Sequence, residues 1–153
     1  MRIALYQPEI AGNVGAVLRL AACFGVGVDV IEPTGFVFSD ARMKRAGMDY
    51  IDQADMVRHS DWSAFRTQVV GRLILLTTKG DVSLYDMVFQ PEDVLMFGRE
   101  SAGVPHDVAA HCAARVRIPI AASTRSLNLS VSAGIALSEA LRQTGRQTGE
   151  LPI

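Results

Sequence analysis

Residues 115–142 read RVRIPIAASTRSLNLSVSAGIALSEALR, and the rest of the fold is organised around this stretch. It predicts a strand over 115–120, a loop of small residues over 121–125, and a helix from Ser126 or Leu127. The helix carries Gly, Ala and Ser among its aliphatic residues and almost no large polar group. A helix that is apolar all round is buried on more than one face. From the pattern alone, a tightly packed C-terminal core helix explains these features.

The remainder of the chain alternates apolar segments with helical ones. The apolar segments are nearly continuous, which is typical of parallel strands covered on both faces. Strands are expected over 2–6, 26–31, 72–77 and 93–97, with 47–57 irregular or a short strand. Helices are expected over 13–24, ended by Gly25, over 40–46, over 61–70, capped by Asp61, and over 105–112. This order predicts an α/β fold with a mainly parallel sheet and helices on both faces. Without internal repeats, residues 1–153 are expected to form one domain.

Composition excludes several classes of protein. The formal net charge is −1, so nothing in the overall charge attracts nucleic acid. Among the 15 Lys and Arg, only Lys44 and Lys79 are lysines, a bias that genome composition explains as well as phosphate binding does. Cys23 and Cys112 are isolated and the three His share no ligand spacing, so no metal is expected. No signal peptide or membrane span is visible, which predicts a cytoplasmic protein.

Ligands of parallel α/β sheets bind in loops at the carboxyl ends of strands. Three such loops are candidates here: 77–80, 98–103 and 121–128. A nicotinamide site is disfavoured because the first turn reads AGNVG and lacks the GxGxxG pattern. The Walker pattern, HExxH and GxSxG are also absent.

Two features have both a structural and a functional interpretation. Asn13 is a good helix cap, and Arg19 fits a surface or salt-bridged position. Yet the sequence around Arg19, VLRLAACF, is strongly apolar, so this arginine needs a partner, either a carboxylate or a substrate phosphate. Likewise, 98–103 (GRESAG) is either an ordinary strand-to-helix turn or a place where backbone meets a ligand.

Three segments together go further than any one of them. NVGAVLRLAACFGV, LMFGRESAGVP and RIPIAASTRSLNLSVSAGIALSEALR, in this order, resemble the three motifs of the SPOUT methyltransferases. The resemblance covers nearly the whole chain, from Ile3 to about Arg142. Within that superfamily the chain is similar to the short single-domain group that methylates the ribose 2′-hydroxyl of cytidine or uridine 34 in tRNA.

The resemblance implies a deep C-terminal trefoil knot, a homodimer, S-adenosylmethionine as cofactor and the tRNA anticodon stem-loop as substrate. It implies catalytic roles for Asn13, Arg19, Ser126 and Asn128. The cofactor would be bound by Leu76, Thr77, Thr78, Gly98, Glu100, Ile118, Ile120, Ser126 and Leu127. Because no separate RNA-binding domain is present, we expect RNA to contact basic residues of the dimer: Arg42, Lys44, Arg45, Arg58 and Arg125. A solvated charged face is the alternative for these.

The sequence departs from the family pattern at two places near the cofactor loops. Arg99 stands where this group often has proline, and 122–124 (AST) replaces a segment that often carries an acidic residue. The family proposal makes Arg19 the catalytic group, but a guanidinium stays protonated at physiological pH and does not act as a base. We hypothesise that Arg19 positions a phosphate and stabilises the developing alkoxide while a substrate phosphate takes the proton. Tyr6, Glu9 and Ser126 are the secondary candidates for this proton transfer.

Other functions stay open at this point. The chain is alternatively a methyltransferase for another tRNA position or for rRNA, or a catalytically inactive RNA-binding relative. A dinucleotide-dependent oxidoreductase is the third hypothesis, which the missing glycine pattern disfavours.

Overall fold

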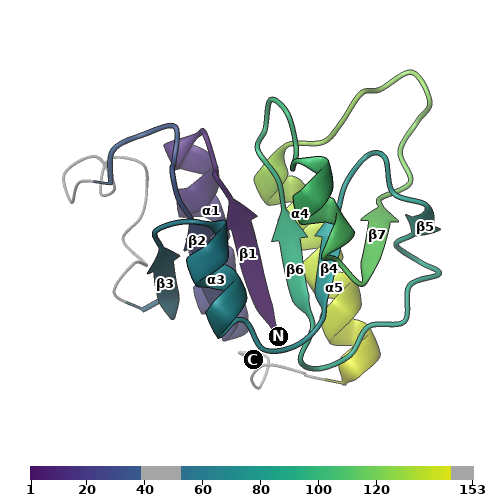
Figure 1. Ribbon diagram of the computed structural model, residues 1–153. Coiled ribbons are helices and arrows are strands. Elements are labelled where there is room, and N and C mark those ends of the chain that lie inside the picture. The colour runs from purple at the N-terminus through teal and green to yellow at the C-terminus, as the bar shows by residue number, and fades with distance from the viewer. Residues whose placement is uncertain (39–52, 146–153) are drawn as a thin grey trace.

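A computed structural model describes residues 1–38 and 53–145. In these ranges, seven strands form one sheet in the order β3-β2-β1-β6-β4-β7-β5, and every neighbouring pair is parallel (Figure 1). The strands are β1 (Arg2–Tyr6), β2 (Gly27–Ile31), β3 (Met56–His59), β4 (Leu73–Leu76), β5 (Val82–Ser83), β6 (Val94–Phe97) and β7 (Ala114–Arg117). The helices are α1 (Ala11–Phe24), α3 (Trp62–Gln68), α4 (His106–Ala110) and α5 (Leu129–Thr144).

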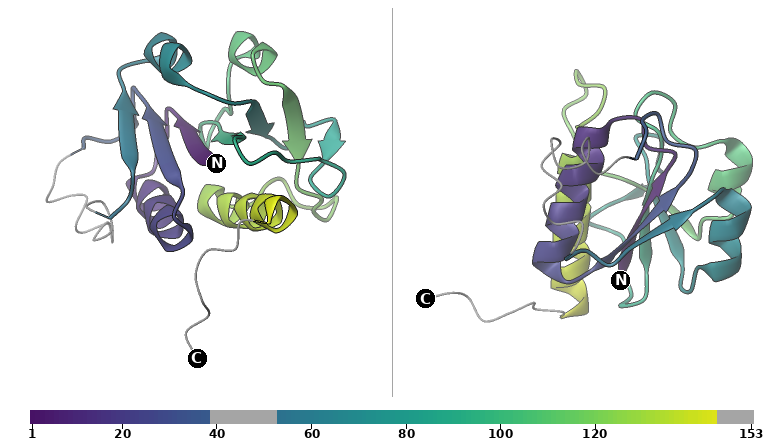
Figure 2. Two further views of the ribbon diagram at one scale, coloured as in Figure 1. Left: turned by 90° about the horizontal axis from the view of Figure 1, so that it is seen from below. Right: turned by 90° about the vertical axis from the view of Figure 1, so that its left-hand side faces the viewer.

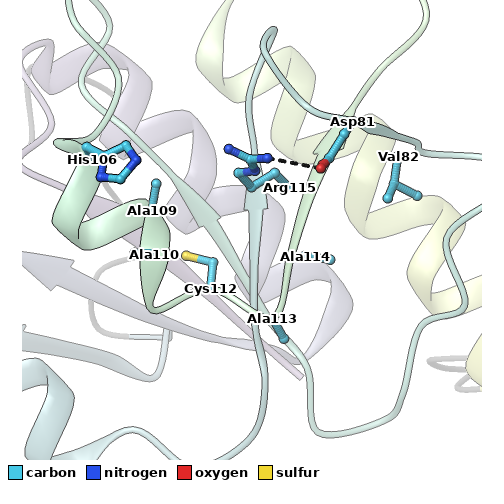
Figure 3. Close-up of a pocket in the computed structure, with 9 residues that line it drawn as sticks. All are labelled: Asp81, Val82, His106, Ala109, Ala110, Cys112, Ala113, Ala114 and Arg115. Atoms are coloured by element: carbon cyan, nitrogen blue, oxygen red, sulfur yellow. Dashed lines mark hydrogen bonds and ion pairs between the residues drawn. The ribbon is translucent and has the colours of Figure 1, made fainter.

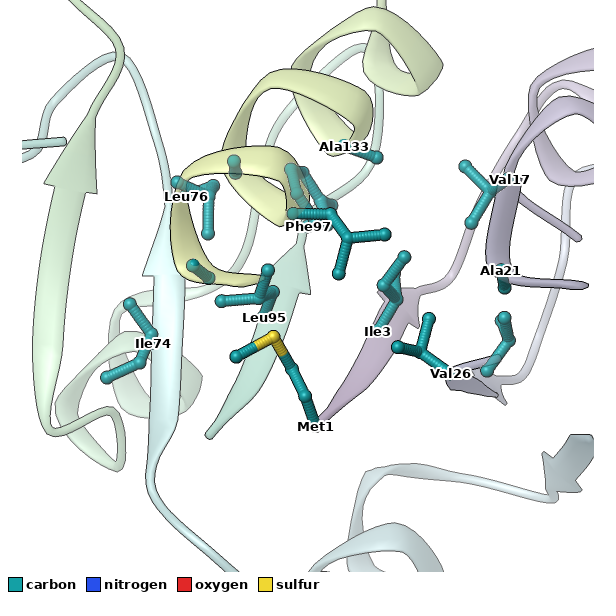
Figure 4. Close-up of a cluster of buried hydrophobic side chains, with 14 of the residues drawn as sticks. Met1, Ile3, Val17, Ala21, Val26, Ile74, Leu76, Leu95, Phe97 and Ala133 are labelled. Carbon is teal, nitrogen blue, oxygen red and sulfur yellow. The ribbon is translucent and has the colours of Figure 1, made fainter. Parts of the chain in front are cut away.

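Helices cover both faces of the sheet, as the sequence predicted. Figure 2 shows α1 and α5 together on one side and α3 and α4 on the other. The larger core lies on the α1 and α5 side, where Ile3, Leu95 and Phe97 of the sheet meet Val17 and Ala133 of the helices (Figure 4). The four residues of β4 and the four of β6 are all buried, which is why these segments are apolar without alternation.

Helix α5 differs from its prediction in two ways. It begins at Leu129, because Asn128 is the N-cap and its side chain accepts hydrogen bonds from the backbone N–H groups of Ser130 and Val131. Only one face of α5 is buried, and Val131 on another face is 49% exposed. For a single chain, the prediction of burial on more than one face is therefore wrong. The buried residues are Leu129, Ala133, Ala136, Leu137, Ala140 and Leu141.

Local signals elsewhere were partly correct. Asp61 caps α3 by accepting a hydrogen bond from the N–H of Ala64, and Gly25 ends α1 with a φ of 60°. Asn13 was wrong as a cap, because α1 begins at Ala11 and Asn13 is buried inside it. Strand β7 ends at Arg117, earlier than predicted, ahead of Pro119, which has no N–H for a sheet ladder. The predicted helix over 40–46 lies outside the described residues.

The parallel arrangement brings the candidate loops to one edge of the sheet. In register, Leu5 of β1 and Leu76 of β4 both pair with Phe97 of β6, and Leu76 also pairs with Val116 of β7. The loops that follow these strands therefore start side by side, at what we call the carboxyl edge; the opposite side is the amino edge. The knotted threading of the C-terminal segment stays a prediction. No helix within the described ranges has the length and hydropathy to cross a membrane.

Candidate functional site at the carboxyl edge

A chain of hydrogen bonds joins the three segments that carry the family resemblance. The Glu100 carboxylate accepts from the backbone N–H groups of Glu9, at 2.8 Å, and Ile10, at 3.3 Å. It also accepts from Asn13 Nδ2 at 3.1 Å, and Asn13 Oδ1 accepts from Asn128 Nδ2 at 3.0 Å. We call Glu100, Asn13 and Asn128 the relay.

The relay explains why an asparagine stands inside α1. Asn13 is only 8% exposed, and a buried amide costs free energy unless both of its ends are hydrogen-bonded. The Asn13 side-chain N–H group donates to Glu100, and its side-chain oxygen accepts from Asn128. Since Asn128 Oδ1 caps α5, the relay fixes the start of α5 against α1 and the turn after β6. Three predicted site residues are thus brought together.

A second carboxylate secures the same turn from the other direction. Glu9 accepts hydrogen bonds from the Ser101 N–H at 2.8 Å and the Ser101 hydroxyl at 2.7 Å. These bonds lower the pKa of the Glu9 carboxyl from its ordinary value of 4.5. Glu9 and Glu100 therefore each bind the loop that carries the other, an arrangement we call the carboxylate clasp. Sequence analysis named Glu9 only as a helper and missed Ser101, since nothing local pairs residues 92 positions apart.

The turn from Gly98 to Gly103 is closed by its own backbone. Arg99 N–H donates to the carbonyl of Gly103 at 3.0 Å, and Gly103 N–H donates to the carbonyl of Arg99 at 2.8 Å. A Cβ at Gly98 would lie 2.5 Å from the carbonyl carbon of Gly103, and Gly103 has a φ of 65°. Both glycines are thus required by the turn itself, the first by close approach and the second by its left-handed backbone.

The predicted cofactor residues lie on three loops of the carboxyl edge. Leu76 is buried at the end of β4, Thr77 is half-buried and Thr78 is exposed. On the loop after β7, Ile118 is half-buried, whereas Ile120 and Leu127 are 37% and 38% exposed. Apolar side chains together with a few polar groups, such as the hydroxyls of Thr77 and Thr78, are the kind of lining that an adenosyl group binds. The residues present therefore fit an adenosyl cofactor.

The structure does not join every predicted site residue to the relay. Arg19 is exposed on the outer side of α1, six residues after Asn13, so its apolar sequence context reflects the buried side of the helix. Ser126 and Arg125 are exposed in the loop before α5. Arg58 forms an ion pair with Glu32 and lies over the ring of Phe38 at 4.3 Å. Arg42, Lys44 and Arg45 lie outside the described residues.

Two cavities lie apart from the predicted cofactor residues. One, of about 300 Å³, lies between α4 and β7 and is lined in part by Asp81, His106, Cys112 and Arg115 (Figure 3). Burial raises the pKa of the Cys112 thiol to about 11, so it stays protonated at neutral pH and is a poor nucleophile. The other cavity, of about 290 Å³, lies beside Arg2, Asp29, His59 and Phe65. In the described part of the chain, no group of three or more His, Cys, Asp or Glu is placed to hold a metal ion.

Residues 1–138 match the SpoU rRNA Methylase family. The chain belongs to this family. Among its relatives, the tRNA (cytidine(34)-2′-O)-methyltransferase of Beijerinckia indica is 51% identical over 146 residues, which cover 94% of this chain and 91% of the relative. The protein of the same name from Escherichia coli K12 is 40% identical over 148 residues, which cover 95% of this chain and 94% of the relative.

Solved structures agree with this assignment. A structure described as giving insight into the 2′-OH methylation of C/U34 on tRNA matches with a TM-score of 0.87 and 40% identity, over 93% of this chain and 94% of that one. The SpoU methyltransferase AviRb from Streptomyces viridochromogenes, in complex with AdoMet, matches with a TM-score of 0.79 and 26% identity, over 94% of this chain and 60% of that one. The expected SPOUT-type α/β fold is thereby confirmed.

Proposed function

We propose that this chain is a tRNA methyltransferase that transfers a methyl group from S-adenosylmethionine to the ribose 2′-hydroxyl of nucleotide 34, a cytidine or uridine. The observation that carries the proposal is the relay of Glu100, Asn13 and Asn128, which holds the three motif segments together at the carboxyl edge. Relatives of similar length that bear this activity in their names support it. We further propose that residues 1–153 form one cytoplasmic domain.

The cofactor residues on the loops after β4, β6 and β7 have distinct tasks in this proposal. When bound, S-adenosylmethionine supplies the methyl group from its sulfonium. Ile118, Ile120 and Leu127 provide apolar contact for the adenosine, and backbone groups around Leu76 and Gly98 approach it closely. Thr77, Thr78 and Ser126 offer hydroxyls that recognise polar atoms of the cofactor. The Glu100 carboxylate is bonded to Asn13 and to the backbone N–H groups of Glu9 and Ile10, so its role is to position the turn.

Arg19 acts on the RNA in this proposal. A guanidinium remains charged at physiological pH and offers a planar pair of donors to phosphate oxygens. Arg19 therefore binds a substrate phosphate and stabilises the negative charge that develops as the 2′-hydroxyl transfers its proton to an oxygen of that phosphate. Asn13 and Asn128 position α1 and α5 for this step and act through the loops they hold.

A second copy of the chain completes the assembly. Four large apolar side chains are exposed on α5, before α1 and on the loop that leads to α5: Ile10, Ile120, Leu127 and Val131, between 37% and 51% exposed. A symmetric dimer that covers Val131 would bury a second face of α5, as its composition predicted. This proposal assigns Arg42, Lys44, Arg45 and Arg125 to the RNA surface of the dimer.

The test begins with the purified protein, titrated with S-adenosylhomocysteine by calorimetry while light scattering gives its mass. We expect micromolar binding to a dimer, followed by mass-spectrometric detection of 2′-O-methylation at position 34 of a tRNA transcript. Binding without methylation of any tRNA or rRNA would instead indicate an inactive RNA-binding relative. No binding by a monomer would refute the proposal. Arg19→Lys tests the role of the guanidinium, because near-full activity would show that its planar geometry is not needed.

A further inference from the structure

The cations of the described residues fall into two groups. Five arginines of the described residues have a carboxylate partner within ion-pair distance: Arg2, Arg58, Arg72, Arg115 and Arg142. At the carboxyl edge, Lys79, Arg117 and Arg125 have none among residues 1–38 and 53–145. Three arginines belong to neither group: Arg19 on α1, Arg66, which lies 5.8 Å from the ring of Trp62, and Arg99, which lies 6.0 Å from the ring of Tyr6 and whose charge acts on Glu9.

Lys79 and Arg117 are held next to each other by backbone contacts. The turn that carries Lys79 packs directly on β7, since a Cβ at Gly80 would lie 2.5 Å from the carbonyl carbon of Val116 and 2.6 Å from the nitrogen of Arg117. Thr77 N–H donates to the carbonyl of Val116 at 2.9 Å, and Leu84 N–H donates to the carbonyl of Arg117 at 2.8 Å. The backbone that carries Lys79 is thereby held against the backbone of β7 at Arg117, and both side chains are exposed.

Arg115 and Arg117, on the same strand, differ in whether they have a carboxylate partner. They lie two residues apart on β7 and so point to the same face of the sheet, and both are exposed. Arg115 forms an ion pair with Asp81, with Nη2 3.0 Å from Oδ2, and its guanidinium lowers the pKa of the Asp81 carboxyl. No carboxylate lies within ion-pair distance of Arg117 in the described part of the chain. One cation of this strand is neutralised internally and the next is left for an external anion.

We propose that Lys79 and Arg117, together with Arg125 on the following loop, form a phosphate-binding strip for the RNA backbone beside the cofactor loops. The inference rests on the proposed function and adds residues to it. The successive phosphates of an RNA backbone carry one negative charge each, so they can neutralise several neighbouring cations at once. A lone cofactor carboxylate would neutralise only one of them.

The test compares Arg117→Ala and Lys79→Ala with the matched control Arg115→Ala, which removes the same charge from the same strand. Binding of an unmodified tRNA transcript is measured over a series of salt concentrations, and S-adenosylhomocysteine binding is measured by calorimetry. We expect each strip variant to weaken RNA binding roughly 3- to 10-fold and to reduce the slope of log affinity against log salt by about one. The control should change RNA affinity less than about 2-fold. Cofactor affinity should be unchanged in all three.

Equal losses of RNA affinity in Arg117→Ala and Arg115→Ala would overturn the proposal, because the overall positive charge of the protein would then explain both. A loss of S-adenosylhomocysteine affinity in Arg117→Ala would also overturn it and assign the cation to the cofactor. Arg117→Lys keeps the charge with little change in shape and should restore RNA affinity, which separates binding from misfolding. Failure of the wild-type protein itself to bind or methylate RNA would refute the proposed function rather than the location of the strip.

Discussion

The two edges of the sheet use charged groups in opposite ways. At the amino edge, the Asp93 side chain is only 1% exposed. It accepts hydrogen bonds from Nε and Nη2 of Arg72, each at 2.8 Å, and from the backbone N–H of Gln90. Asp29, also buried, accepts from Arg2 Nε at 2.7 Å and lies 2.9 Å from His59 Nε2. These carboxylates are satisfied by the protein itself.

At the carboxyl edge, amide and carboxylate side chains hold loops together, and Lys79, Arg117 and Arg125 are exposed. Asn13 links α1 to loops from distant parts of the chain, and Lys79 and Arg117 lack an internal carboxylate among the described residues. At the amino edge, ion pairs between the protein's own side chains stabilise the fold. Around the relay the carboxyl edge is held by hydrogen bonds; the Arg58–Glu32 ion pair lies at the carboxyl end of β2, whereas Lys79, Arg117 and Arg125 have no carboxylate partner among the described residues.

Removing a carboxylate from the amino edge should have the largest effect on folding. Asp93→Ala leaves Arg72 and the Gln90 N–H without their acceptor, so we expect the free energy of unfolding to fall by about 3 kcal/mol. Urea denaturation measures this, with S-adenosylhomocysteine affinity retained by the folded protein. The matched control is Asp81→Ala, which breaks an exposed pair and should cost much less, because solvent screens such a pair. Equal losses in the two variants would contradict the structural role of the amino edge.

The next largest effect is expected from a methyl group added at the closed turn, and the property that it changes is ligand affinity. In Gly98→Ala the new Cβ would meet Gly103 backbone at 2.5 Å, and backbone cannot move aside as a side chain can. We expect S-adenosylhomocysteine affinity to fall on the order of 100-fold as the turn opens. Gly103→Ala strains a positive φ but meets no atom within 4 Å, so its loss should be smaller. The reverse order of the two losses would argue against this turn geometry.

The smallest expected effect comes from the carboxylate clasp, and it depends on pH. Because hydrogen bonds from Ser101 lower the pKa of Glu9 in the folded protein below 4.5, its stabilising contribution is complete above that pH and disappears as the pH falls through the folded value. Glu9→Gln should weaken S-adenosylhomocysteine binding about 2- to 5-fold at neutral pH. Urea titrations should show the stability difference from wild type shrinking towards zero as the pH falls below 4.5.

Glu139→Gln is the control for this pH dependence. Arg142 and Gln143 lower the pKa of Glu139 to about 2, so its contribution should persist to more acidic pH than that of Glu9. It lies near the end of α5, away from the clasp, and its loss should leave cofactor affinity unchanged. If Glu9→Gln kept a constant stability difference down to pH 3, the carboxylate of Glu9 would not be the group that titrates.

Local sequence determined the elements of this protein. Continuous apolar segments predicted buried parallel strands, Asp61 predicted the start of α3, and Gly25 predicted the end of α1. These signals succeed because burial periodicity, capping and backbone dihedrals are decided by residues a few positions apart. The parallel sheet then places the candidate loops at one edge without further information.

Only the tertiary structure decided what the site residues do. Asn13 has the chemistry of a helix cap, yet its partners are Glu100 and Asn128, 87 and 115 residues away. The sheet order, in which β6 lies between β1 and β4, determines these contacts. Likewise, the composition of α5 showed that its faces are apolar but not that one stays uncovered in a single chain. Local patterns encode which groups must be buried or bonded, whereas the packing of distant segments chooses their partners.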